Sequence, residues 1–396
     1  MNEDKATRYN RLKRRATVCS VVWNVVCLAG LALTGFSRAL RDAGSAIVPS
    51  GHPALVVAGY VALLSVVNEI GALPIAFYGG FLVERRYGLS HEGLGVWIGD
   101  EAKSFAIGLL LGGASAILLY FFIRRSADAW WLPAGGAFAL LVVGLANLAP
   151  VVLLPLFYRV KPLDRESLRT RLLTLASRAG ARVVGAYEWG LSEKTKKANA
   201  ALAGLGATRR ILVSDTMLAE YSEDEIEVVL AHEMAHHVHG DIWKGLLFDS
   251  GLIVAGFYLA SRVLRWATAP LALSGPADVA GLPVLLLAAG TLSVVMLPAA
   301  HALSRACERS ADRFALELTR NPAAFVSAMR RLAAQNLAEE HPSALIQWLF
   351  YSHPSIRERI AAAETWAVVE GVRPRDRSPG AARWGGDADG PHGGTE

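Results

Sequence analysis

The chain has 396 residues, of which 53% are hydrophobic and only 19% charged, a composition too apolar for an ordinary soluble enzyme of this size. The net charge is +5, but the Lys and Arg residues cluster beside apolar segments instead of forming a stripe interleaved with aromatics, so membrane topology explains them better than nucleic-acid binding. Three cysteines without CxxC spacing argue against a disulfide framework and against a cysteine zinc site.

The N-terminal end is basic and leads into an apolar stretch over about residues 17–36. This stretch has ~20 residues, the length of a membrane span, whereas the apolar part of a cleaved signal peptide is shorter. No clean small-residue cleavage site follows it. We therefore predict a signal anchor with the N-terminus inside.

Further apolar stretches long enough to cross a membrane cover about residues 54–83, 105–123, 131–157, 245–264 and 282–303. Starting from an inside N-terminus, six spans place residues 84–104, 158–244 and 304–396 on the cytoplasmic side. Polar side chains within the spans, at Asn68, Glu69 and Asp249, would be costly in lipid. We expect them to face the protein interior or water, or alternatively a neighbouring helix.

The segment between spans four and five has the pattern of a small α/β portion. Residues 164–178 predict an amphipathic helix ended by Gly180, and residues 182–189 predict a strand. Residues 197–203 and 209–214 predict a hairpin around Gly204 and Gly206.

A helix that carries an HExxH pattern follows this portion. Ser222 and Glu225 form a capping-box pattern, which opens a helix running to Gly240. On that helix His232 and His236 lie four residues apart on one face, so both rings can reach a single metal ion. Glu233 sits beside that face, where its carboxylate can act as a general base. The alternative is a solvated helix with two unrelated histidines.

The region after span six supplies a candidate third ligand. Residues 304–318 continue as a helix, Asn321-Pro322 caps another, and residues 355–366 predict a third, before a tail from about residue 373 that we expect to be disordered. Glu308 would ligate the metal, while Asp312, one turn later, would buttress a metal-bound histidine. From spacing alone, an exposed pair of carboxylates on a solvated helix face remains the alternative.

Taken in order, these residues resemble the type 1 CAAX prenyl protease family of integral-membrane zinc metallopeptidases. The similarity joins the HExxH helix to the Glu308-x-x-x-Asp312-x-Phe314-Ala315 sequence after two spans. Further similar blocks are Leu73-Pro74 through Gly88, Ala149-Pro150 through Pro162-Leu163, Lys197-Ala198-Asn199-Ala200 with Asp215-Thr216, and Tyr351-Ser352-His353-Pro354 with Arg359.

The resemblance implies a mainly α fold, a polytopic membrane helical barrel of about six spans with a cytoplasmic-side, zincin-like α/β catalytic portion. It implies one zinc ion on His232, His236 and Glu308, with Glu233 activating water and His353 steadying the oxyanion. Asn199 and Ala200 would form the edge strand that pairs with an extended peptide, and Arg359 would pair with Asp312 or a neighbouring carboxylate. Without the family context, His353-Pro354 is a turn before a helix.

We divide the chain into five expected parts: a transmembrane bundle (1–157), the α/β portion with the HExxH helix (158–243), spans five and six (244–304), C-terminal catalytic helices (305–370) and a disordered tail (371–396). No long insertion separates Tyr221 from the HExxH helix, and the family often has a His where Asp241 stands. This compactness is typical of a bacterial inner-membrane member.

The sequence therefore predicts a zinc endopeptidase that acts on peptide or protein substrates, lipidated or membrane-embedded, at the cytoplasmic face. Two alternatives stay open: a bacterial quality-control protease for damaged membrane proteins, and a transporter or scaffold with structural zinc. The second requires a closed site with four ligands, and the sequence offers no fourth Cys or His at matching spacing.

Overall fold

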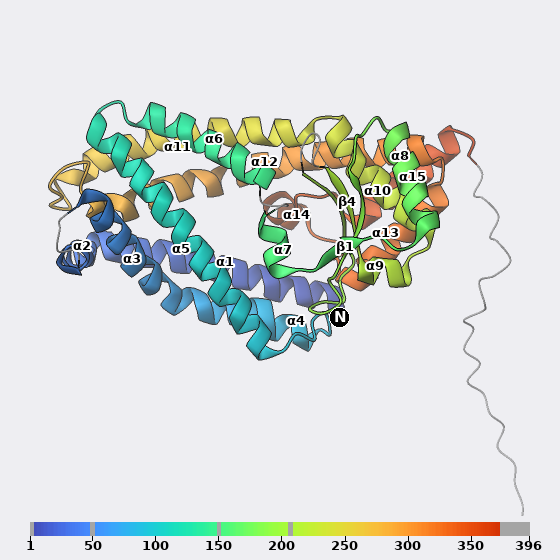
Figure 1. The fold of residues 1–396 in the computed structure, drawn as a ribbon, viewed down its shortest axis with the longest axis horizontal. Helices are drawn as coiled ribbons and strands as arrows, with labels where there is room; N and C mark the ends of the chain where they lie inside the picture. Colours follow the sequence, from blue (N-terminus) through green and yellow to red (C-terminus); the bar gives the residue numbers. More distant parts are fainter. Residues whose placement is uncertain (1–3, 48–51, 149–151, 205–208, 373–396) are drawn as a thin grey trace, which may run out of the picture.

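A computed structural model describes residues 4–47, 52–148, 152–204 and 209–372 (Figure 1). Three sequence predictions lie outside the described residues: the disordered tail from residue 373, the Ala149-Pro150 block and the turn residue Gly206. In the described part, six helical segments are long and apolar enough to cross a membrane, as predicted. They are α1 (Lys5–Leu33), α3 with its continuation (Pro53–Arg86), α5 (Leu94–Arg125), α6 (Trp131–Leu148), α11 (Asp241–Thr268) and Val279–Thr319, which contains α12 (Leu282–Thr319).

The membrane helices form two groups joined at one end. In Figure 1, α6, α11 and α12 run along one side of the molecule, while α1 and α3 run along the other and α5 crosses between them. A buried apolar cluster joins these helices at the end far from the sheet, where Tyr60, Tyr120 and Trp130 are almost completely buried. The short helix α2 (Phe36–Ile47), which the sequence reading missed, packs against α3 there.

Span two contains a distortion with a local cause. Pro74 lies inside α3 (Pro53–Ala76), where its missing N–H removes a helical hydrogen bond. Directly after it, residues Phe77–Leu82 form a π-helix, η1, before α4 (Val83–Arg86) resumes the α-helical pattern. This distorted stretch leads to Glu84, a buried carboxylate that accepts a hydrogen bond from Tyr9 of α1.

The start of one predicted span differs in the structure, and another predicted span is only partly described. α5 begins eleven residues before the expected residue 105, since the charged residues Asp100, Glu101 and Lys103 and the turns before them are also helical. The expected span over residues 131–157 contains α6 (Trp131–Leu148) and α7 (Leu154–Phe157), and residues 149–151 between them lie outside the described residues.

A four-stranded sheet stands at one end of the helical layers, in the order β1-β2-β4-β3. Its strands are β1 (Val160–Pro162), β2 (Gly185–Trp189), β3 (Ala200–Ala203) and β4 (Arg210–Ser214). The predicted hairpin of β3 and β4 is confirmed as an antiparallel pair, whereas β1 was not predicted. β3 comes last in this order, so it forms one edge of the described sheet.

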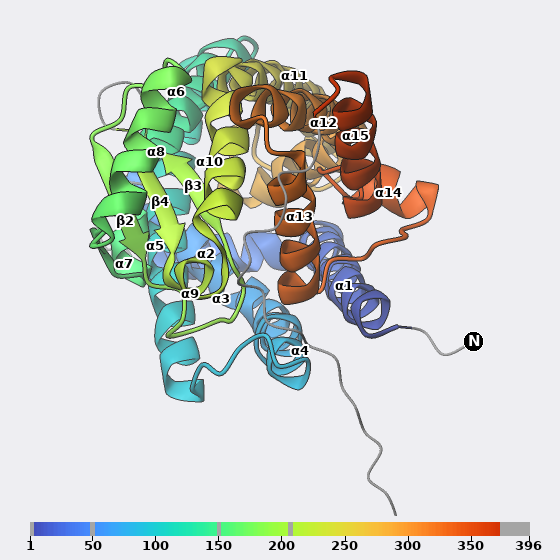
Figure 2. The same ribbon diagram turned by 90° about the vertical axis from the view of Figure 1, so that its right-hand side faces the viewer.

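Helices pack beside this sheet and on the far side of α10, at the same end of the molecule (Figure 2). They are α8 (Glu166–Arg178), α9 (Asp215–Glu220), α10 (Glu223–Val238), α13 (Pro322–Asn336), α14 (Ala344–Phe350) and α15 (Ile356–Val369). α10 packs against α8 and β3 on one side and against α12 and α13 on the other. The predicted caps are present: Ser222 and Glu225 form the capping box of α10, and Asn321 caps α13 ahead of Pro322.

The polar residues predicted within spans lie in two different settings. Asn68 and Glu69 of α3 line a cavity of about 320 Å³ together with Glu101 of α5, so they face the interior of the molecule. Asp249 of α11 is exposed.

Candidate functional site

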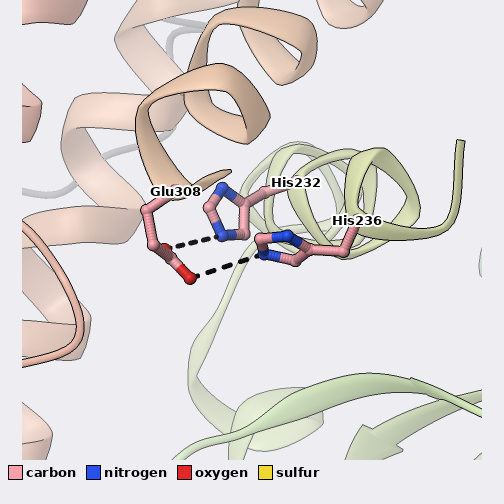
Figure 3. A group of neighbouring side chains, drawn as sticks. All are labelled: His232, His236 and Glu308. Atoms are coloured by element: carbon pink, nitrogen blue, oxygen red, sulfur yellow. Dashed lines mark ion pairs between the residues drawn. The ribbon is translucent and has the colours of Figure 1, made fainter. Parts of the chain in front are cut away.

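The HExxH residues lie on α10, and its packing sets their direction. Ile226, Leu230 and Met234 recur at four-residue intervals and are completely buried in the core that α10 shares with the sheet. His232 and His236 lie on an adjacent face with the same spacing, and Figure 3 shows both rings directed at the Glu308 carboxylate. Their ring centroids are 5.0 Å apart.

Glu308 reaches this pair from α12, 72 residues beyond His236. Its carboxylate lies 3.2 Å from Nε2 of His232 and 3.5 Å from Nε2 of His236. One ligand atom from each of the three residues falls within 4.8 Å of the others. Both Nε2 atoms therefore face one point, where a carboxylate oxygen is also available.

The opposite nitrogen of each ring is held by a carboxylate. Nδ1 of His232 lies 2.8 Å from Asp312, which the sequence reading had proposed as a buttress, and Nδ1 of His236 lies 3.0 Å from Asp241. Such partners fix the tautomer that leaves Nε2 free for a metal. The role of Asp241 was missed. Gly240, in the left-handed conformation with φ 67°, turns the chain so that Asp241 starts α11 beside His236.

Arg359 of α15 completes the support behind His232. Its Nε donates to Asp312 at 2.8 Å, and its guanidinium also contacts the second Asp312 oxygen. Both residues are less than 10% exposed, so this ion pair is desolvated. Arg359 therefore contacts Asp312, which the family resemblance gave as one of its expected partners.

The surroundings shift the pKa values of His232 and Glu233, which are adjacent on α10. For His232, burial lowers the pKa, but hydrogen bonds to Asp312 and Glu308 outweigh burial and raise it to about 9. A proton therefore competes with a metal ion for this ring. For Glu233, which is half-buried, burial raises the pKa above that of a free carboxyl group. A raised pKa suits a general base that must later return its proton.

His353 approaches the same centre from the loop between α14 and α15. Its Nδ1 lies 2.8 Å from Glu308, while its side chain remains 60% exposed. Tyr351, two residues earlier, holds this loop: its hydroxyl donates to the buried Glu339 at 2.7 Å, and its carbonyl accepts from Arg305 at 2.7 Å. Arg14 of α1 donates to both Glu339 and the Tyr351 hydroxyl.

The predicted substrate residues lie at the sheet edge beside α10. Asn199 immediately precedes β3 and is exposed, whereas Ala200 opens β3 with its side chain in the core. α10 contacts this strand, and Nε2 of His237 lies 3.0 Å from the carbonyl oxygen of Leu202.

The donor set fits a metal ion. Two imidazole nitrogens and one carboxylate oxygen converge, both histidines have outer carboxylate partners, and His353 is the only further titratable group that contacts the Glu308 carboxylate within the described residues. Two His and one Glu are ligands typical of a catalytic zinc site, which keeps a fourth position open.

Comparison with known proteins agrees with this geometry. Residues 162–367 match peptidase family M48, and residues 2–159 match the CAAX prenyl protease N-terminal family, described as five membrane helices. The uncharacterized metalloprotease YhfN of Bacillus subtilis (strain 168) is 32% identical over 363 residues, which cover 91% of this chain and 84% of that protein.

Two yeast proteins extend the comparison. The probable CAAX prenyl protease 1 of Schizosaccharomyces pombe is 25% identical over 304 residues, covering 76% of this chain but only 64% of that longer protein. The crystal structure of S. mikatae Ste24p matches with a TM-score of 0.81 and 23% identity, covering 91% of this chain and 88% of that chain. This last match concerns the fold.

The membrane helices, the His-Glu cluster and these matches define a multi-pass integral-membrane metallopeptidase. The chain belongs to peptidase family M48. The family resemblance and the fold class predicted from the sequence are confirmed, a metal ion and peptide or protein substrates are implied, and neither the quality-control nor the transporter alternative is favoured.

Proposed function

We propose that the protein is a zinc endopeptidase that cleaves an extended peptide segment of a membrane-tethered substrate at the cytoplasmic face of a bacterial inner membrane. The observation that carries this proposal is the convergence of His232, His236 and Glu308, whose ligand atoms lie within 4.8 Å of one another. These three residues would hold the zinc ion. When bound, zinc supplies Lewis-acid polarisation of a carbonyl group and lowers the pKa of water.

The remaining steps belong to side chains of this chain. Glu233 takes a proton from the attacking water and then gives it to the nitrogen of the leaving amine. His353 donates a hydrogen bond to the carbonyl oxygen of the scissile bond as negative charge develops there, a contribution of about 2.7–4 kcal/mol in comparable sites. Asp312 and Asp241 hold the ligand rings, and Arg359 holds Asp312.

Substrate orientation comes from the edge strand. An extended peptide pairs with the backbone at Asn199 and Ala200, so its scissile carbonyl lies in fixed geometry above α10. We place residues 158–243 and 305–370 in the catalytic portion, and residues 1–157 and 244–304 in the membrane portion. The substrate carries a lipid, such as a prenyl group, that holds it at the membrane, and nucleic acid has no part in the reaction.

The test uses the purified protein in detergent with two substrates, a farnesylated CaaX peptide and unfolded casein. Wild type is expected to cleave the lipidated peptide and to contain zinc by mass spectrometry. Glu233→Gln is expected to keep its zinc and lose cleavage. Full proteolysis by Glu233→Gln would rule out this mechanism, and cleavage of casein alone would rule out the lipidated substrate.

Orientation needs a separate experiment. A green fluorescent protein fused after residue 372 folds in the bacterial cytoplasm, so strong fluorescence is expected. A dark but fully inserted fusion would place the catalytic end on the opposite side of the membrane.

A further inference from the structure

The backbone of β3 alternates between groups that bond β4 and groups that face away from it. The N–H of Ser214 donates to the carbonyl of Asn199 at 3.0 Å, and Ala200 is opposite Val213 in the register. In an antiparallel pair this pattern turns the N–H and C=O of Ala200 away from β4. By the same alternation, Ala198 and Leu202 also present their backbone groups along the open edge.

At the Ala198 end of this edge, a side chain already bonds the outward backbone groups. Asn336, the last residue of α13, accepts from the N–H of Ala198 at 3.1 Å and donates to its carbonyl at 3.3 Å. A side-chain amide has one acceptor and one donor group, so it can satisfy both backbone groups as a neighbouring strand would. The adjacent Gln335 donates to the carbonyl of Lys196 at 2.8 Å.

The other end is partly occupied as well. Nε2 of His237 bonds the carbonyl oxygen of Leu202, so that acceptor is used. Ala200 lies between these two caps, and no hydrogen bond within the described residues reaches its outward N–H or C=O. Ala200 is only 5% exposed, because its side chain lies in the core between the sheet and α10.

We propose that Asn336 is a positioning residue that limits strand pairing of the substrate to Ala200. Asn336 caps Ala198, and His237 caps the carbonyl of Leu202. One substrate residue, the one opposite Ala200, therefore finds both a backbone donor and a backbone acceptor on the edge. Recognition through the backbone is therefore confined to a short segment at one register, and side-chain contacts set the rest of the specificity. This inference rests on the proposed edge-strand binding.

The experiment scans backbone N-methylation along one peptide. A cleavage site is first mapped by mass spectrometry in whichever of the two substrates is cleaved, the farnesylated CaaX peptide or unfolded casein, and a peptide across it is made with a single N-methyl group at each position in turn. N-methylation removes one donor, so it weakens cleavage only where that N–H pairs with the enzyme. For wild type, we expect a loss in kcat/KM of roughly tenfold at one position, the residue opposite Ala200.

Asn336→Ala frees the carbonyl of Ala198. A second sensitive position is then expected two residues from the first, because strand pairing alternates with a period of two. Gln335→Ala is the matched control: it loses a comparable bond from the same helix end while Ala198 stays capped, so its profile keeps one sensitive position. Asn336→Ser, which is too short to bond both groups of Ala198, serves as the second variant should Asn336→Ala not fold.

The outcomes separate this inference from the proposed function. Two sensitive positions in an Asn336 variant and one in both wild type and Gln335→Ala support it. An unchanged profile in a folded Asn336 variant, or two positions already in wild type, overturns it while strand binding stands. Cleavage by wild type with no sensitive position overturns edge-strand binding and this inference together, and leaves the peptidase activity intact.

Discussion

Nδ1 of His236 lies 3.0 Å from Oδ2 of Asp241, the first residue of the helix that follows the HExxH helix. The turn at Gly240 creates this contact between two residues only five positions apart. The outer carboxylate fixes the ring so that Nε2 faces Glu308. Metal affinity should therefore depend on a residue that is not itself a ligand.

The first prediction concerns Asp241→Asn, which keeps the shape of the side chain but removes its charge. Loss of an outer partner of this kind weakens metal binding by about 10–100-fold, and we expect a loss in that range. Competition for zinc with a chelator of known affinity measures it. Lys244→Met is the control, because Lys244 pairs with the other Asp241 oxygen, is half exposed and does not contact His236. Equal losses in the two variants would contradict the explanation.

The second prediction compares the zinc affinity of two variants, one of the proposed ligand Glu308 and one of Asp241, which holds a ligand ring. Glu308→Gln removes the charged oxygen that faces both Nε2 atoms, so it should weaken zinc binding more than Asp241→Asn does. The same chelator competition compares the two variants in one assay. Unchanged zinc affinity in Glu308→Gln would mean that the third ligand lies elsewhere.

The third prediction concerns the buried ion pair of Arg359 and Asp312. Arg359→Met leaves a desolvated carboxylate without its cation, and breaking such a pair costs about 3–5 kcal/mol. A lower thermal midpoint in detergent is expected. Arg313→Met, on the same helix as Asp312, removes an exposed partner of Glu317 and should leave the midpoint unchanged. If both variants melted like wild type, the pair would contribute nothing to stability.

The fourth prediction tests how the His353 loop is held. Tyr351→Phe removes the hydrogen bond to the buried Glu339, which should let His353 move and lower kcat roughly 10- to 100-fold while zinc content and KM stay the same. If Tyr351 acts through His353, the double variant with His353→Ala should be no slower than His353→Ala alone. Additive losses would assign Tyr351 a separate role.

The membrane helices and the HExxH helix could be predicted because their signals are local. Apolar length identifies a span, and the Ser222 capping box with the four-residue spacing of His232 and His236 places both rings on one face. The contact of Glu308 with the two histidines was harder to predict, because it joins distant parts of the chain. Glu308 lies 72 positions beyond His236, and from spacing alone it could not be distinguished from an exposed helical carboxylate until the family resemblance singled it out.

The contacts that the sequence did not predict depend on turns and on side chains that cap the backbone of distant elements. Asp241 contacts His236 only because Gly240 takes a left-handed conformation, and no periodic pattern reports such a turn. Asn336 stands at a helix end, where it looks like an ordinary capping residue in the sequence. Its bonds to Ala198, 138 positions earlier, follow from how α13 packs beside the sheet.

The contact of Arg14 with Glu339 and Tyr351 has a consequence for biosynthesis. Arg14 belongs to α1, whereas its partners are synthesised more than 300 residues later. The His353 loop can take up its working position only when nearly all of the described chain has left the ribosome. During synthesis, therefore, the HExxH helix is present for some time without Glu308, His353 and Arg359, which all follow it in the chain.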